Sequence, residues 1–586
     1  MRDKDGMCRD SQPSVVCARA PSRSHGFAVD AAAPMTPERE ADGEPVSQLI
    51  GDFGRWQLLM TLALALFNVP CTWHIFVPTF QSAHEDFWCA PPPQLADLPV
   101  EQWRNLSHLP SPEKGTFDSC HIWDVNYNLS AQEILDELRR PGLTTRPCTE
   151  WNFDTSEFGE TVISQWSLVC DRAQLTNVAE MTFLTGVAVG GLVSGLVSDK
   201  FGRKRTLMVS LALQISVATV MAFSPWFELY VVLRLILGFI SVGIVFSGFV
   251  LCMELVGGKW RTISGVSYLF PVPLAYIIIA GIAYLVRGWS NLQLAITLPS
   301  VILLGLWWVL PESPLWLLAL GRKDEVLVIL EEAARFNKME LPPRADKILQ
   351  QGIPQKEGSE DASAGCLDLF RTPNLRKNSL VLYVIWFSVY IVYYGLVLNL
   401  GNIGGNVYVN TVLSGVVELP SIAISILFLL KMGRRWPFCL TLLLSGIACL
   451  LTIPVPLDKD LQWVTIALAM AGKFAISSSN VIMPVFTAEL FPTVIRNLGV
   501  GASNVSAGIA LMLVPYLWNL SEMDDRVPMG LLGVCAVVGG LCVLLLPETA
   551  DRPLPGTLAE GEDNSRRMST VEKQRTNNSS TGSCNS

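Results

Sequence analysis

Long apolar runs separated by polar segments are the main pattern of this chain. Runs of about 20 residues, the length that crosses a bilayer as a helix, occur at twelve places. They lie near 57–80, 175–198, 206–224, 229–253, 262–286, 291–310, 379–399, 407–430, 436–456, 461–486, 498–518 and 527–546. The pattern predicts an all-α membrane protein with twelve transmembrane helices.

Three short motifs each occur twice and divide the spans into two sets of six. The repeated pairs are Gly202-Arg203-Lys204 with Gly433-Arg434-Arg435, Glu254 and Arg261 with Glu489 and Arg496, and Pro311-Glu312-Ser313 with Pro547-Glu548-Thr549. The offset between the two copies is nearly the same for all three motifs. Nearly equal offsets predict two homologous halves, as in parallel-repeat transporters. The first spans of the two halves are further apart than these offsets, so an insertion must follow span one.

These boundaries give a predicted domain organisation. It comprises a disordered cytoplasmic arm (1–55), a first six-helix half (56–311) with an extracellular loop (82–174), a cytoplasmic helical bridge (312–378), a second half (379–547) and a disordered cytoplasmic tail (548–586). In the bridge, apolar residues recur at helical spacing within 324–337, which predicts a helix there.

The inserted loop carries signs of an oxidising, extracellular location. Asn105 and Asn128 each begin an Asn-Leu-Ser sequon and are expected to carry glycans. Four cysteines lie in or at the edge of this loop and are disulfide candidates: Cys89, Cys120, Cys148 and Cys170. Four cysteines allow three connectivities, and the sequence leaves all three open, with free thiols as the alternative.

Composition and charge agree with a membrane location. Only 16% of the 586 residues are charged, against roughly a quarter in soluble proteins. Lysines and arginines cluster in the short loops predicted on one side, which places that side and both termini in the cytoplasm. No Gly-x4-Gly-Lys-Ser/Thr phosphate loop is present, the five histidines fit no compact metal site, and no catalytic constellation is evident. We therefore expect neither an enzyme nor a cofactor, a metal or a nucleic-acid partner.

Several motifs resemble one transporter family. Residues 195–205, Gly-Leu-Val-Ser-Asp-Lys-Phe-Gly-Arg-Lys-Arg, resemble the loop between spans two and three of major facilitator transporters. Glu160–Cys170, Pro311–Leu317 and Glu489–Gly499 are similar to motifs of the organic cation, anion and carnitine transporters (amphiphilic solute facilitators), with Leu315 replacing the usual Arg. The resemblance covers about residues 48–550. It implies the major facilitator fold, a plasma-membrane location and secondary transport by alternating access.

Charges inside the spans are costly and are therefore functional candidates. Glu418 lies in the middle of span eight, where similar family members carry a carboxylate, and Lys473 lies in span ten. For Glu418, a role in substrate or coupling chemistry and a structural hydrogen-bond role are both open. Lys473 has three open roles: binding an anionic group, pairing with Glu418, or locking two helices. Glu180 lies near the predicted extracellular end of span two and is expected to be a wetted vestibule residue.

Aromatic residues offer a second set of substrate-binding candidates. Trp386, Tyr390 and Tyr393 share one face of span seven by their helical spacing. Such a face suits cation–π capture of an ammonium group, with helix packing as the alternative. Phe249 in span four is a weaker candidate, as are Phe270 and Tyr276 in span five.

The resemblance also implies a cytoplasmic charge network that closes the outward-facing state. The candidate gating residues are Asp199, Arg203, Arg234, Glu254, Arg261, Glu489 and Arg496. Where cation carriers of the family have Asp in span eleven, and anion or carnitine carriers have Arg, this chain has Gly508. An Asp in span seven of some cation carriers is Val389 here. These two positions therefore leave the sign of the substrate charge open.

We expect a secondary carrier of small organic cations or zwitterions, embedded in the lipid bilayer. One alternative is an organic anion or carnitine-like carrier. Another, from a different class, is a non-transporting receptor on a transporter fold; the intact 195–205 motif disfavours it. The oligomeric state does not follow from the sequence.

Overall fold

A computed structural model describes residues 49–110, 117–127, 129–139, 142–343, 345–351, 369–370, 372–398, 405–456, 461–492, 495–524 and 526–549. These described residues group into one compact unit. The predicted arm before residue 49 and tail after residue 549 lie outside the described residues, as does Asn128. The predicted division into two halves, a bridge and two ends stays a prediction.

The first six predicted spans are helical, and several of them consist of more than one piece. The bounds are α2 (Arg55–Ala65), α3 (Asn68–Phe76) and α4 (Pro78–Gln81) in span one; α8 (Gln174–Phe201); α9 (Arg203–Met221); α10 (Phe227–Glu254); α11 (Gly258–Ser267) and α12 (Pro271–Leu285) in span five; and α13 (Trp289–Thr297), η4 (Leu298–Ser300), α14 (Val301–Leu304) and η5 (Gly305–Trp308) in span six. Proline explains three of the breaks, because Pro78, Pro271 and Pro299 have no N–H for the helical hydrogen bond.

The second six spans are single helices. They are α18 (Pro373–Leu398), α19 (Val407–Lys431), α20 (Arg435–Leu450), α21 (Gln462–Leu490), α22 (Arg496–Leu517) and α23 (Val527–Val543). Among the described residues, nine helical segments are long and apolar enough to cross a membrane, and α20 and α23 are shorter apolar helices. With α9, which begins with three cations, they make up the twelve predicted spans and confirm the fold class.

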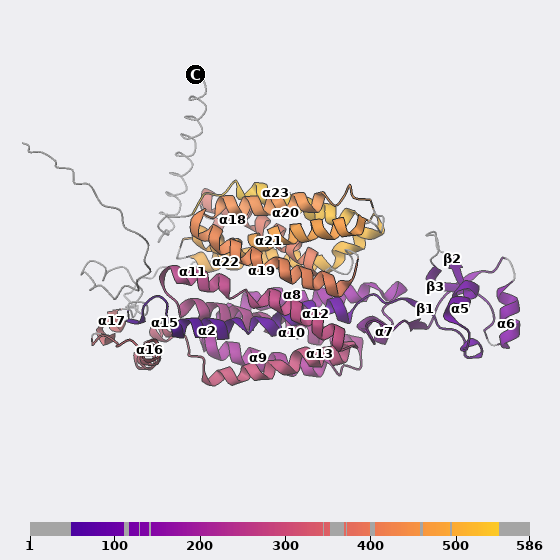
Figure 1. Ribbon diagram of the computed structural model, residues 1–586, viewed down its shortest axis with the longest axis horizontal. Helices are drawn as coiled ribbons and strands as arrows, with labels where there is room; N and C mark the ends of the chain where they lie inside the picture. The colour runs from indigo at the N-terminus through magenta and orange to yellow at the C-terminus, as the bar shows by residue number, and fades with distance from the viewer. Residues whose placement is uncertain are drawn as a thin grey trace, which may run out of the picture. The chain divides into compact units, whose positions relative to one another are not determined.

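Helix contacts follow the two sets of six. In the first set α10 packs against α8 and α9; in the second, α20 packs against α21 and α23, and α18 against α22 and α23. Two extended contacts join the sets, α8 with α22 and α12 with α19. Figure 1 shows the second set in orange to yellow beside the first set in purple to magenta. Side chains from both sets therefore meet along these two contacts.

The segment after span one forms a small folded unit with strands, which the hydrophobic pattern did not predict. Its elements are β1 (Phe87–Cys89), η2 (Pro93–Leu95), α5 (Val100–Ser107), β2 (His108–Pro110), β3 (Phe117–Trp123), α6 (Ala131–Leu138), β4 (Thr145–Pro147), β5 (Trp151–Phe153), α7 (Val162–Trp166) and η3 (Cys170–Arg172). β1 pairs with β5, and β2, β3 and β4 form a second sheet, all antiparallel. We call the end of the helices that carries this unit the loop end.

Two disulfides cross-link this unit and resolve the open connectivity. Cys89 bonds to Cys148 and Cys120 to Cys170, each with Cα atoms 5.7 Å apart. Cys170 lies just before α8, so the second disulfide ties the sheet to the bundle. Asn105 is exposed on α5, as a glycan acceptor must be.

At the opposite end, which we call the basic end, three helices follow span six (Figure 1). They are α15 (Pro314–Ala319), α16 (Lys323–Asn337) and α17 (Ala345–Gln351). The predicted helix within 324–337 is confirmed by α16, whose apolar face is buried. Asn337 at its end donates to Gln57 (3.0 Å) and accepts from the Trp56 amide (2.9 Å), which fixes α16 against α2.

Candidate functional site

A buried ion pair lies between α19 and α21. The Lys473 Nζ is 2.9 Å from Glu418 Oε2, and the side chains are 2% and 5% exposed. Tyr393 on α18 donates its hydroxyl hydrogen to Glu418 Oε1 at 2.7 Å, and its ring centroid is 3.5 Å from Lys473 Nζ. Each charge therefore has a compensating partner, without which burying it is strongly unfavourable. Of the three roles open for Lys473, the structure shows pairing with Glu418.

Close helix packing brings the first set of spans to this pair. Gly415 on α19 faces α12, where an added Cβ would lie 2.7 Å from the Pro273 carbonyl oxygen. Only a residue without a Cβ permits this approach. It places Tyr276 of α12 beside the pair, with its hydroxyl 3.2 Å from that of Tyr393. The Tyr276–Tyr393 hydrogen bond joins the two sets of spans.

Two tyrosines at the pair and two aromatic residues that pack on them form what we call the aromatic group: Tyr276, Tyr393, Phe76 and Tyr394. The Phe76 ring on α3 meets the Tyr276 ring edge-on with centroids 4.5 Å apart, and stacks on Tyr394 at 6.4 Å. Tyr393 and Tyr394 are 5.1 Å apart. Tyr276 was a weak candidate from sequence, and no sequence signal distinguished Phe76 from other apolar residues of span one.

The predicted aromatic face of span seven extends the group along α18. The Trp386 ring stacks on Tyr390 at 5.8 Å, and Tyr390 lies 5.6 Å from Tyr394. The Trp386 indole N–H donates to Thr487 on α21 at 3.0 Å. Phe249 does not join them: its ring packs against Tyr268 at 5.8 Å, in a separate apolar cluster of the first set.

The repeated motifs form two equivalent charge networks at the basic end. Arg203 donates from Nε and Nη2 to the two oxygens of Glu254, both at 3.2 Å, and pairs with Asp199 at 2.8 Å. The Glu312 carboxylate accepts from the Lys204 amide at 2.9 Å. The repeat motif contains Glu312, yet sequence reasoning gave this residue no role.

The second copy has the same plan without the aspartate. Arg434 pairs with Glu489 at 3.0 Å, and its amide donates to Glu548 at 2.9 Å. Thr549 donates its hydroxyl to Glu489 at 2.6 Å. At the first turn of α22, burial lowers the pKa of Arg496, and the charge of Glu489 acts in the opposite direction. In the first copy, Arg261 donates to the Met253 carbonyl at 3.1 Å.

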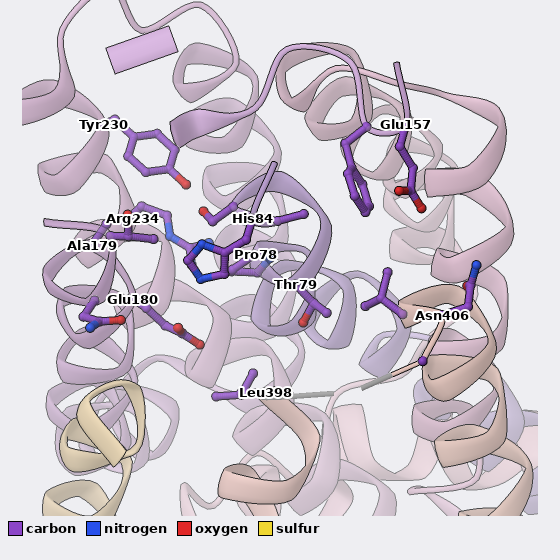
Figure 2. A pocket seen from close by; sticks show the side chains of 17 residues that line it. Pro78, Thr79, His84, Glu157, Ala179, Glu180, Tyr230, Arg234, Leu398 and Asn406 are labelled. Atoms are coloured by element: carbon purple, nitrogen blue, oxygen red, sulfur yellow. The ribbon is translucent and has the colours of Figure 1, made fainter. Parts of the chain in front are cut away.

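Arg234 is not part of either network, which corrects the prediction that grouped it with them. It lies on α10 well before Glu254, the last residue of that helix, and the rise of an α-helix puts the two roughly 30 Å apart along the axis. It is therefore near the loop end, where it lines a cavity together with Glu180 (Figure 2). Its Nη1 donates to the His74 carbonyl at 3.3 Å. The prediction was wrong because Arg234 lies near the first residues of α10, at the end of the helix opposite to Glu254.

Comparisons with known proteins agree with this architecture. The family model described as "Sugar (and other) transporter" matches residues 121–557. An organic cation transporter protein of Drosophila melanogaster is 37% identical over 88% of this chain and 93% of its own length. Solute carrier family 22 member 13 of Homo sapiens is 34% identical over 88% and 92%. The chain belongs to the organic cation, anion and carnitine transporter family of the major facilitator superfamily. It is a multi-pass membrane carrier and not an enzyme.

Solved structures show the same fold. The partially occluded, inward-open xylose transporter XylE from E. coli matches with a TM-score of 0.55 and 16% identity, over 85% of this chain and 100% of that one. Among the described residues, no group of three or more His, Cys, Asp or Glu side chains is placed to hold a metal ion.

The structure also explains one family position that is uninformative here. Gly508 of α22 faces α8, and an added Cβ would lie 2.7 Å from the Cβ of Ala188. In this carrier the position serves the close contact between the two sets of spans. A charged side chain would not fit without separating α8 from α22. Gly508 therefore does not indicate the sign of the substrate charge in this chain.

Proposed function

We propose that this chain is a secondary carrier that moves small organic cations or zwitterions across the plasma membrane by alternating access. The observation that carries the proposal is the buried Glu418–Lys473 pair within the aromatic group, where the two sets of spans meet. An ammonium substrate takes the place of Lys473 at the Glu418 carboxylate. A carboxylate on the same substrate then takes the ammonium of Lys473.

The contacts of the pair favour this exchange. The Lys473 Nζ lies 2.9 Å from a single carboxylate oxygen, Glu418 Oε2, and among the described residues no other acceptor contacts it. Lys473 therefore keeps donors for a substrate carboxylate. The Tyr393 face already holds one ammonium at 3.5 Å, so it suits another, at about 0.5 to 2 kcal/mol per ring. The site is neutral overall, which suits a zwitterion; a cation without a carboxylate gains the Glu418 carboxylate and the aromatic faces but is repelled by Lys473.

Names of relatives support the same substrate class. Besides the organic cation transporter, a beta-alanine transporter and a carcinine transporter of Drosophila melanogaster are 33% and 32% identical over 89% and 88% of this chain. Beta-alanine carries one ammonium and one carboxylate. Glu418 serves every such substrate, whereas Lys473 serves those that carry a carboxylate.

Contacts between the two sets of spans at two different depths in the membrane support alternating access. The Tyr276–Tyr393 hydrogen bond joins the sets at the pair, and Asn177 of α8 donates to Asn519 of η9 (Trp518–Glu522) at 2.9 Å near the loop end. The charge networks at the basic end hold each set together. Opening one end while the other closes requires the Tyr276–Tyr393 bond to break or re-form, which couples the movement to occupancy of the pair.

The proposed orientation places the basic end and both termini in the cytoplasm. Asn105 and Asn128 then lie outside the cell and carry glycans. Asn105→Gln and Asn128→Gln together should increase gel mobility as much as enzymatic deglycosylation does. Unchanged mobility would contradict this orientation.

Uptake by cells expressing the chain tests the function. Labelled tetraethylammonium, beta-alanine and an organic anion such as para-aminohippurate are compared at two membrane potentials. A cation carried uncoupled gains about 2.3 kcal/mol per 100 mV, equivalent to roughly fifty-fold accumulation, whereas an uncoupled zwitterion gains none. Glu418→Gln should abolish uptake of both, and Lys473→Ala only that of beta-alanine. If Glu418→Gln leaves cation uptake intact while Lys473→Ala abolishes anion uptake, the chain is an anion carrier.

A further inference from the structure

A cavity of about 360 Å³ lies at the loop end, next to the aromatic group. Leu398 lines it, one helical turn beyond Tyr394 on α18. Thr79 also lines it, three residues beyond Phe76 in span one. Residues of both sets of spans contribute to the wall, including Asn406 before α19 (Figure 2). The cavity is therefore immediately outside the Glu418–Lys473 site on the loop side.

Two opposite charges on neighbouring helices line this cavity. Arg234 on α10 is 1% exposed, and its guanidinium lies 4.5 Å from the Phe183 ring centroid. Its Nε is buried and has no hydrogen-bond partner among the described residues. Glu180 on α8 is partly buried; Arg234 attracts it electrostatically, but no ion pair joins them in the described part of the chain. Figure 2 shows both side chains at the same side of the cavity.

A buried guanidinium without a contacting anion is unfavourable, and a carboxylate ligand removes this cost. Thr176 adds a further polar group to the wall of the cavity: its hydroxyl is buried and has no hydrogen-bond partner within the described residues. The exposed Glu157 lies on the far side of the cavity from Glu180 (Figure 2). A cation without a carboxylate gains Glu180 but is repelled by Arg234. The volume is in the range of small-molecule sites.

We propose that this cavity is an outer subsite that binds a small zwitterion, with its carboxylate on Arg234 and its ammonium on Glu180, before it reaches Glu418 and Lys473. The choice of ligand class rests on the proposed function. The subsite holds one positive and one negative side chain, as the inner site does. In both sites each charge of the zwitterion therefore has an opposite charge to pair with. The carrier then has two binding sites for the same zwitterionic substrate, the outer subsite and the Glu418–Lys473 site.

Equilibrium binding of labelled beta-alanine to the purified full-length chain in lipid nanodiscs tests the subsite. The wild type should bind two equivalents. Glu180→Gln should weaken one of them at least about tenfold, as expected for a lost hydrogen bond to a charged group. The control Glu228→Gln, an exposed carboxylate in the first turn of α10, should change neither. Glu418→Gln should remove the other equivalent.

A second variant keeps the proposal falsifiable if one protein fails to fold. Arg234→Lys retains the charge but loses the planar fork that binds a carboxylate; it should weaken the same equivalent as Glu180→Gln in monodisperse protein. One equivalent or none in the wild type, or two that neither variant affects, would overturn the subsite. Cellular tetraethylammonium uptake that depends on Glu418 upholds the proposed function even then. Uptake insensitive to Glu418→Gln overturns that function, while Glu180-dependent binding still supports the subsite.

Discussion

Neutralising Glu418 should separate the structural role of the ion pair from its transport role. Glu418→Gln keeps an oxygen that accepts the Tyr393 hydrogen bond but leaves Lys473 as a buried charge without its counter-ion. Breaking a buried pair from one side costs about 3–5 kcal/mol. With an unfolding entropy of about 2.1 cal/mol/K per residue, this lowers the apparent Tm of the 586-residue chain by about 3 °C.

The double variant Glu418→Gln/Lys473→Met carries no buried charge at this site. Replacing a buried ion pair with neutral groups of similar volume is often neutral or stabilising, so the apparent Tm should return to within about 1 °C of the wild type. Transport should not return. A substrate ammonium still loses a hydrogen bond to a charged group, about 1.5–3 kcal/mol, which is about 10- to 150-fold in affinity.

Thermal unfolding in detergent and uptake by cells, corrected for surface expression, measure the two effects in the same variants. The exposed Glu228→Gln serves as the control for a lost carboxylate. Recovery of both stability and uptake in the double variant would refute a substrate role for Glu418 and leave only a structural one. If the double variant is as unstable as Glu418→Gln, the loss of stability does not come from a buried Lys473 without its counter-ion, and that part of the reasoning is refuted.

Three further predictions concern positions away from the pair. Glu254→Gln should reduce the apparent Tm and uptake more than Asp199→Asn, because Glu254 makes two contacts to Arg203 and is 18% exposed, whereas Asp199 is 65% exposed; equal effects would contradict this ranking. Gly508→Ala should lower the free energy of unfolding by about 1–3 kcal/mol, because the added methyl group forces α22 away from α8. At the control position Gly501 an added Cβ meets nothing within 4 Å, so Gly501→Ala should not destabilise the protein. The apparent Tm measures both effects. Burial raises the pKa of Glu85, in the segment after span one, from 4.5 to about 7. Its contribution to stability is therefore complete below the unfolded-state pKa and lost as the pH rises through the folded-state pKa. Because Glu85 is partly exposed, the loss of folding free energy is about 1 kcal/mol at most. The Glu85→Gln variant should not show this loss. Curves of Tm against pH that have the same shape for both proteins would contradict the raised pKa of Glu85.

The sequence by itself determined the elements and the chemical candidates. Twelve apolar runs predicted the spans because a bilayer demands about 20 apolar residues per helix. Glu418 and Lys473 were visible as candidates because a charge within an apolar run is rare and costly. The family resemblance implied a charge network that includes Arg203 and Glu254, and the structure shows the ion pair between them.

Only the tertiary structure decided which of these groups meet. Tyr276 and Tyr393 are 117 residues apart, and their hydrogen bond depends on the close approach of α19 to α12 at Gly415. The disulfide connectivity was one of three until the folded unit after span one brought Cys89 to Cys148 and Cys120 to Cys170. Four of its five strands have only three residues and carry no readable alternation. Arg234 was grouped with the basic end, although its place along α10 puts it at the loop end. The first two cases share a physical reason: periodicity describes one element, whereas the tyrosine contact and the disulfides depend on how separate elements pack.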